Sequence, residues 1–152
     1  MEKAGTTKGR IRAISISKER GTPKVNVHEA ELKADFGIVG DAHAGNWLRQ
    51  VSLLAVESIE KMVAEGMKVS AGDFAENITT EGIDLPALKV GSKLKIGSSV
   101  ELEVAQLGKQ CHRRCSVFEK VGDCIMPREG VFAKVTRPGR VMVGDVIEVF
   151  ND

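Results

Sequence analysis

The stretch LKVGSKLKIGSSVELEVAQL, residues 88–107, decides the fold class of this chain. Apolar and charged residues alternate on both sides of Gly97, Ser98 and Ser99. An alternation of this kind, with a period of two, is typical of β-strands that bury one face. The small residues in the middle are suited to a tight turn. The stretch therefore predicts two strands joined by a turn.

Similar short patterns occur on both sides of this hairpin, and turn residues separate them. Alternating or β-branched segments are found at residues 10–18 (RIRAISISK), 25–32 (VNVHEAEL), 49–56 (RQVSLLAV) and 130–150 (GVFAKVTRPGRVMVGDVIEVF). Many short strands at turn-marked intervals, in a chain with 16 glycines, favour a mostly β fold, a closed or nearly closed β-barrel with one or two short helices.

The clearest helix is expected at residues 56–66 (VESIEKMVAEG), where Ile59, Met62 and Val63 recur at helical spacing and Gly66 is a suitable stop. A second, short helix is expected over residues 116–121. Residues 35–46 contain three glycines and predict a long loop that can approach a ligand closely. We expect residues 1–8 to form a disordered tail and residues 9–152 to form a single domain.

Composition excludes several classes of function. The chain of 152 residues carries 22 basic and 21 acidic residues, so its formal charge of +1 gives no overall field that would attract nucleic acid or an anionic membrane. It contains no apolar run long enough to span a bilayer, and its start has no secretory signal, so a cytoplasmic protein is expected. In that reducing compartment the three cysteines are expected to be thiols.

One segment concentrates reactive groups. Residues 108–115 read GKQCHRRC, which places Lys109, His112, Arg113 and Arg114 around Cys111. The thiolate is both the nucleophile and the metal ligand, and neighbouring cations favour it by lowering the pKa of the thiol. The residues alone leave two readings of Cys111 open: a reactive or metal-ligating thiol, or a small apolar side chain in the core.

A zinc site is an alternative for the same segment. Cys111, Cys115 and Cys124, with His112 or His43, would supply a four-ligand set of sulfur and nitrogen donors. Structural zinc sites usually contain two close pairs of ligands, and this chain has three and eight residues between its cysteines. The spacing therefore argues against zinc.

Two further runs and one arginine carry polar groups that suit a binding site. GDAHAGNWLRQ (40–50) includes Asp41, His43 and Arg49, and GDFAENITTEG (72–82) includes Asn77 and Thr79. Turn chemistry alone explains many Gly-Asp pairs, but His43 and Asn77 look more like site residues. Arg128 follows Met126-Pro127, and its guanidinium is suited to bidentate recognition of phosphate or carboxylate.

The order of these motifs resembles the MOSC domain, the module named for the C-terminal part of molybdenum cofactor sulfurase. The motifs run from GDAHAG (40–45), RQVSLLAVE (49–57) and GDFAENITTEGIDL (72–85) to LKVGSKLKIG (88–97), VELEVAQLGKQC (100–111), GDCIMPREGVFAKV (122–135) and VMVGDVIEV (141–149). The resemblance covers residues 9–149, and this chain looks like a small stand-alone member. Many members have proline directly before the functional cysteine, where this chain has Gln110.

The resemblance implies a barrel of the pyruvate kinase type that binds molybdenum cofactor or its molybdopterin precursors. It places the functional cysteine at Cys111, which would carry sulfur or ligate molybdenum, while His43 or His112 adjusts protonation nearby. The expected cofactor contacts are Asp41, Arg49, Asn77, Thr79, Lys109, His112, Arg113 and Arg128. The anionic end of the cofactor is assigned to the arginines and Lys109 among them.

The resemblance also implies partners. We expect this chain to have no pyridoxal-dependent desulfurase region and to bind no pyridoxal phosphate. It would act as a sulfur carrier or as a module that inserts or sulfurates the cofactor, and its expected partner is a sulfur-donor protein such as a desulfurase, or an acceptor molybdoenzyme. Two other functions remain open at this point: a molybdenum-dependent reductase of N-hydroxylated compounds that uses an external electron donor, and a zinc-stabilised, non-catalytic binding protein. No nucleic acid or membrane partner is expected.

Overall fold

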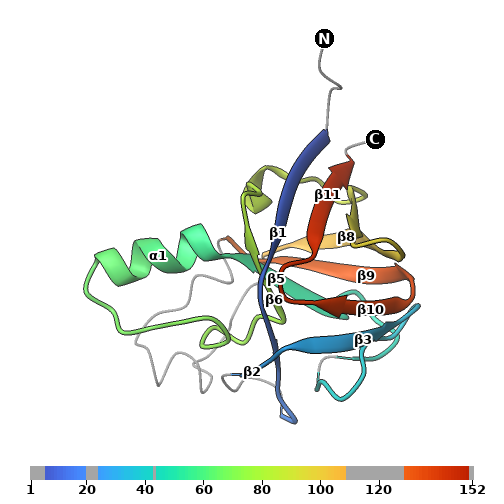
Figure 1. Ribbon diagram of the computed structural model, residues 1–152, viewed down its shortest axis with the longest axis horizontal. Coiled ribbons are helices and arrows are strands. Elements are labelled where there is room, and N and C mark those ends of the chain that lie inside the picture. The colour runs from blue at the N-terminus through green and yellow to red at the C-terminus, as the bar shows by residue number, and fades with distance from the viewer. Residues whose placement is uncertain (1–5, 20–23, 43, 109–128, 151–152) are drawn as a thin grey trace.

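The computed structural model describes residues 6–19, 24–42, 44–108 and 129–150, and in these residues it is a β-barrel with one α-helix (Figure 1). The elements, in chain order, are β1 (Thr6–Ile16), β2 (Val25–Val27), β3 (Glu29–Lys33), β4 (Gly37–Ile38), β5 (Val51–Ala55), α1 (Val56–Ala64), β6 (Ile78–Glu81), the 3-10 helix η1 (Leu85–Ala87), β7 (Lys93–Ile96), β8 (Val100–Leu107), β9 (Val131–Arg137), β10 (Gly139–Met142) and β11 (Val146–Phe150). The expected mostly β barrel fold is confirmed.

The barrel closes between the first and the last strand. The sheet runs β11-β7-β8-β9-β5-β6-β1-β2, and β1 also pairs with β11, so seven strands form the ring and β2 is added outside it. The pairing runs antiparallel from Thr6 opposite Phe150 to Arg10 opposite Val146. The expected disordered tail over residues 1–8 is therefore wrong for residues 6–8, because the backbone hydrogen bonds of β11 hold them in the sheet.

The barrel interior follows the alternation that the sequence predicts. In β7 and β8, Leu94, Ile96, Leu102 and Val104 are buried, while Lys93 and Lys95 are exposed. The two strands form the expected antiparallel hairpin. Inward residues of the other strands, among them Leu53, Ile78 and Val149, complete one continuous apolar cluster.

The segment 25–32, expected to be one strand, is two strands in two different sheets. β2 pairs with β1, whereas β3 lies in a second, three-stranded sheet of order β10-β3-β4. The break falls at His28, which is exposed and lies between them. The alternation changes phase at the break, from Val25 and Val27 to Ala30 and Leu32, because the two polar residues His28 and Glu29 follow each other.

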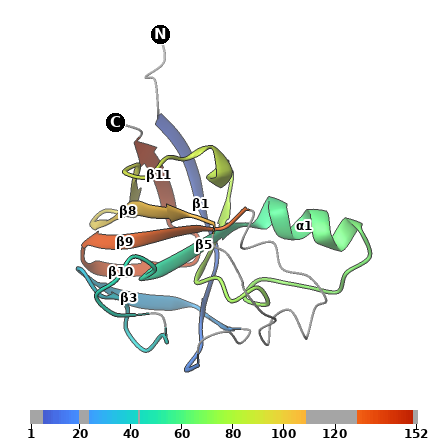
Figure 2. The same ribbon diagram turned by 180° about the vertical axis from the view of Figure 1, so that it is seen from behind.

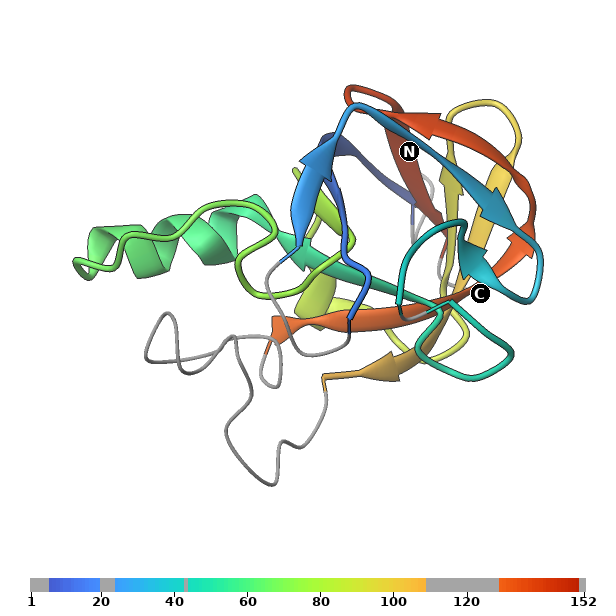
Figure 3. The same cartoon turned by 90° about the horizontal axis from the view of Figure 1, so that it is seen from below.

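Helix α1 connects β5 to β6, which are the one parallel pair among the described strands. Parallel neighbours require such a crossover. On α1, Ile59 and Met62 are buried, as expected, but Val63 is 48% exposed. The helix projects away from the barrel (Figures 2 and 3). No helix in the described residues is long and apolar enough to cross a membrane.

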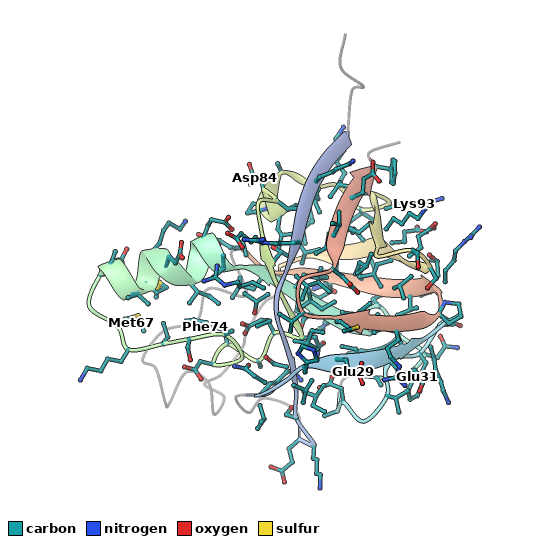
Figure 4. All side chains as sticks on the ribbon, in the orientation of Figure 1. Glu29, Glu31, Met67, Phe74, Asp84 and Lys93 are labelled. Carbon is teal, nitrogen blue, oxygen red and sulfur yellow. The ribbon has the colours of Figure 1, made fainter. Side chains whose placement is uncertain are left out.

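A second apolar cluster lies outside the barrel, between α1 and the outer faces of β5 and β9. It contains Leu54, Ile59, Met62, Phe74 and Phe132. Phe74 belongs to the segment that returns from α1 toward β6 (Figure 4). This cluster fixes α1 and the return segment to one end of the barrel, where most of the polar residues discussed next are found.

Candidate functional site

The segment with the cysteines leaves and re-enters the described structure at one point. Gly108 follows β8, Glu129 and Gly130 precede β9, and the Gly108 N–H donates a hydrogen bond of 2.7 Å to the Gly130 carbonyl oxygen. Much of the predicted site lies outside the described residues: Lys109, Cys111, His112, Arg113, Arg128 and His43. The same is true of Cys115, Cys124 and the short helix expected over 116–121.

Helix α1 holds the point of re-entry. The Ser58 hydroxyl donates a hydrogen bond to Glu129 Oε1, and Lys61 Nζ lies 2.9 Å from Glu129 Oε2. A cavity of about 570 Å³ borders this contact, lined by Ala55, Glu57, Ser58, Lys61, Gly82, Ile83, Asp84, Pro86 and Glu129. The base of the segment is therefore fixed to the helix as well as to β8.

Arg49 lies near the same end of the barrel, between two aromatic rings. Its guanidinium carbon is 5.2 Å from the Trp47 ring centroid and 5.8 Å from the Phe132 ring centroid. Phe132 pairs with Gln106, two residues before Gly108, so the stack is close to the start of the cysteine segment. Among the residues that the structure describes, none accepts a hydrogen bond from Arg49 or forms an ion pair with it.

Asp41 is part of a buried ion pair. Lys24 Nζ lies 2.7 Å from Asp41 Oδ1, and both side chains are wholly buried. The same oxygen accepts the Ser17 N–H at 3.0 Å, and the Ser17 carbonyl accepts the Ala42 N–H at 2.8 Å. These contacts attach the loop that begins at Asp41 to the end of β1. The sequence reasoning did not single out Lys24.

Asn77 joins three strands from a fully buried position. Its Oδ1 accepts the Ser52 N–H of β5 at 2.9 Å, and its Nδ2 donates to the Ser15 carbonyl of β1 at 3.1 Å. The Ser15 N–H in turn donates to the Asn77 carbonyl at 2.7 Å. Asn77 therefore connects β1, β5 and the start of β6 through hydrogen bonds. Its role as a cofactor contact stays a prediction.

Thr79 donates a hydrogen bond of 2.9 Å to Glu76 Oε2, which also accepts the Gly72 N–H at 2.8 Å. Glu76 is wholly buried, and its Oε1 has no hydrogen-bond partner among the described residues. Burial raises the pKa of Glu76, and these two hydrogen bonds oppose the rise only in part. Thr79 is also wholly buried, so its direct contact with a ligand likewise stays a prediction.

Gly72 links this carboxyl group to the Lys24 pair. Its carbonyl accepts the Lys24 N–H at 2.7 Å, and its φ of +96° is one that glycine tolerates best. A Cβ at this position would lie 2.6 Å from the Lys24 carbonyl oxygen. The return segment therefore packs against the start of β2 at a distance that only glycine permits.

The predicted site residues therefore separate into two kinds. Asp41, Asn77 and Thr79 hold the walls together through internal hydrogen bonds. Arg49 donates no hydrogen bond to any residue that the structure describes. The sequence reasoning missed Trp47, although one signal pointed to it: it is the single tryptophan of the chain and lies in a polar, glycine-rich loop. Within the described ranges no group of three His, Cys, Asp or Glu could hold a metal ion, and the expected zinc ligands fall outside those ranges.

Several solved structures share this fold. The chain superimposes on the YUAD protein from Bacillus subtilis with a TM-score of 0.82 and 20% identity, covering 97% of this chain and 98% of that one. YiiM from Escherichia coli gives a TM-score of 0.67 at 18% identity, with 94% and 70% covered. YiiM from Geobacillus stearothermophilus gives 0.70 at 17% identity, with 94% and 75% covered. No curated protein sequence matches the chain.

A family model decides the relationship that the motif order suggested. The model of the MOSC domain matches residues 40–148, which include Asp41, Arg49, Asn77 and Thr79 and the whole cysteine segment. The match covers most of the chain, and the barrel described above agrees with it. This chain belongs to the MOSC domain family.

Proposed function

We propose that this chain binds a molybdopterin-type cofactor at the end of the barrel where β8 and β9 meet, and that Cys111 carries sulfur there or ligates molybdenum. The observation that carries the proposal is the position of Arg49, a cation with no ion-pair partner among the described residues, close to the point from which the chain continues to Cys111. Membership of the MOSC family supports the choice of cofactor.

The described residues fit such a cofactor in two respects. Molybdopterin carries a phosphate, and the Arg49 guanidinium, which has no ion-pair partner among the described residues, is suited to a phosphate group. Its pterin is a flat heterocycle, and Trp47 is a partly exposed aromatic ring beside that guanidinium. Lys109, Arg113 and Arg128 are the further cations that we assign to the anionic end. Asp41, Asn77 and Thr79 support the walls of the site.

Cys111 acts through its thiolate. Molybdenum, when bound with the cofactor, supplies a soft metal centre that accepts sulfur ligands. For sulfur transfer, the Cys111 thiolate attacks the outer sulfur of a persulfide on a donor protein; the donor's S–S bond breaks, the donor leaves as a thiolate, and Cys111 becomes the persulfide. His43 or His112 holds the proton that keeps the thiol and thiolate forms in balance. A pyridoxal-dependent desulfurase is the class of protein that can supply the donor persulfide.

The test compares three single variants of the full chain with the parent, purified from a molybdenum-replete host. We expect the parent to contain molybdenum, to show pterin fluorescence, and to accept cyanide-labile sulfur from a persulfide donor. Cys111→Ser should lose the labile sulfur, whereas Cys115→Ser and Cys124→Ser should retain at least part of it. Equal sulfur loading of the parent and Cys111→Ser would show that Cys111 is not the carrier.

Elemental analysis of the same samples tests the cofactor independently. About one zinc per chain, with neither molybdenum nor pterin, would replace the proposal by a zinc-stabilised binding protein. Molybdenum and pterin in Cys111→Ser at the level of the parent would show that the cofactor is held by other residues, and the role of Cys111 would then be limited to sulfur.

A further inference from the structure

Trp47, Arg49 and Phe132 form a stack that we call the arginine clamp. We propose that the arginine clamp is a preformed receptor for a phosphate monoester, in which Trp47 and Phe132 are positioning residues that hold the Arg49 guanidinium in place. The inference rests on the proposed function for the identity of the ligand. The residues, the geometry and the test below belong to the clamp itself.

The first argument is the combination of a fixed cation with unused donors. The ring centroids of Trp47 and Phe132 lie 5.2 and 5.8 Å from the Arg49 guanidinium carbon, both within the range of a cation–π interaction. A guanidinium stacked on aromatic faces keeps its N–H groups directed along its own plane. No described residue uses those groups, so they are available to a ligand at the edge of the stack.

The second argument is that the backbone on both sides of the clamp is anchored. The Gly45 N–H donates to the Phe36 carbonyl at 2.6 Å, and the Trp47 N–H donates to the Gly45 carbonyl at 3.0 Å. On the other side, the buried side chain of Gln50 accepts the Val135 N–H at 2.9 Å. Phe132 itself is 1% exposed in the outer apolar cluster. Because these parts are already ordered, little conformational entropy is lost when an anion binds.

The third argument selects the class of ligand. A planar guanidinium forms two parallel hydrogen bonds to one phosphate, and it remains charged at any physiological pH. Lysine would supply the charge but neither the stacking nor the two-point geometry. The clamp therefore recognises the terminal phosphate of the ligand, and free inorganic phosphate shares this chemistry. Glycerol 3-phosphate serves as the monoester that separates the two sources.

Trp47 makes the test direct. It is the single tryptophan of the chain, which contains no tyrosine, so the intrinsic fluorescence above the phenylalanine range reports on the clamp alone. We expect inorganic phosphate and glycerol 3-phosphate, but not chloride at equal ionic strength, to change Trp47 emission with saturation. Tighter binding of the monoester identifies an esterified phosphate as the natural ligand. Tighter binding of inorganic phosphate would overturn the monoester assignment.

The variants separate charge from stacking, with binding measured by calorimetry and folding by thermal melting. Arg49→Lys should weaken phosphate binding by about tenfold, since it keeps only the charge. Arg137→Lys, the matched control at an exposed arginine paired with Glu101, should bind as the parent does. Trp47→Leu should weaken binding about fivefold, and Trp47→Phe should restore it to within about twofold, because a ring is again present.

Two results would overturn the clamp: no saturable phosphate binding by the folded parent, or equal binding by Arg49→Lys and Arg137→Lys. Full phosphate affinity in a folded Trp47→Leu variant would reject the positioning role of Trp47. If the parent binds phosphate but contains no pterin and carries no sulfur, the proposed function is rejected and the clamp is retained. If the parent contains pterin and carries sulfur but shows no saturable phosphate binding, only the clamp is rejected.

Discussion

Lys24 Nζ lies 2.7 Å from Asp41 Oδ1, and neither side chain has any surface in contact with solvent. Lys24 precedes β2, at the edge of the barrel sheet, whereas Asp41 opens the loop that leads to the arginine clamp. The pair is therefore an internal link between the outermost strand and the loop that carries Arg49. Burying both charges costs desolvation energy, which their attraction offsets at least in part. Removing one partner costs more, because the other charge then stays buried without a counter-ion.

Lys24→Met should destabilise the protein by about 3–5 kcal/mol, because it leaves the Asp41 carboxylate buried without its cation. Lys18→Met is the matched control, since Lys18 is exposed, and it should change the free energy of unfolding by less than about 0.5 kcal/mol. Urea unfolding measures both. Equal stability of the two variants would show that the ion pair contributes nothing net. A double variant, Lys24→Met with Asp41→Leu, should recover part of the loss.

Glu76 should make the stability depend on pH. Its pKa is raised by burial above the ordinary 4.5, so above that pH the folded protein holds a proton that the unfolded chain releases. Stability therefore falls as pH rises from about 4.5 toward the raised pKa. Glu76→Gln removes the ionisable group and should flatten this fall when urea unfolding is measured between about pH 5 and pH 8.

The matched control for Glu76→Gln is Glu60→Gln, at an exposed position on α1. Its unfolding free energies should run parallel to those of the parent over the same pH range. If the curve of Glu76→Gln also stays parallel to that of the parent, the buried carboxyl does not titrate differently in the folded and unfolded chains.

Gly72→Ala should be more harmful than Gly66→Ala, although both glycines have positive φ, +96° and +101°. The backbone cost of alanine in this region is about 1–2 kcal/mol and is common to both. At Gly72 the new methyl would also lie 2.6 Å from the Lys24 carbonyl oxygen, whereas at Gly66 it meets open space. Thermal melting should therefore separate the two variants, and coincident melting temperatures would contradict the close packing at Gly72.

Asn77→Ala should destabilise the barrel by about 1–3 kcal/mol for each buried group that it leaves unpaired, among them the Ser52 N–H and the Ser15 carbonyl. Asn46→Ala, at an exposed asparagine of the loop 41–50, is the control and should have little effect. A melting temperature for Asn77→Ala as high as that of the control would show that the hydrogen bonds of the Asn77 side chain do not stabilise the barrel.

The sequence predicted the barrel where strands bury a single face. The hairpin of β7 and β8 alternates strictly, and its turn residues mark its bounds. β6 was not recognised as a strand because Ile78, Thr79 and Thr80 are all buried, which removes the alternation. In β1 the alternation is interrupted: a bulge between Ile11 and Ala13 shifts the register, so that Ile11 and Ile14, which strict alternation would place on opposite faces, are both buried.

The candidate site was predictable only in part, for a related reason. Arg49 was identified from its type and its place in a glycine-rich loop, but its stacking on Phe132 joins residues that are far apart in the chain. The same applies to the contact of Lys24 with Asp41 and to the burial of Asn77. Hydrogen-bonding side chains have the same appearance in a sequence whether they face a ligand or another strand.

The seam between β1 and β11 also has a consequence for how the protein is made. β1 can pair with β11 only after about 140 further residues have been synthesised, because Thr6 pairs with Phe150 and Arg10 with Val146. Until then one edge of β1 is open to strands of other nascent chains. We expect the interval between the synthesis of β1 and that of β11 to be the one in which this protein depends most on chaperones.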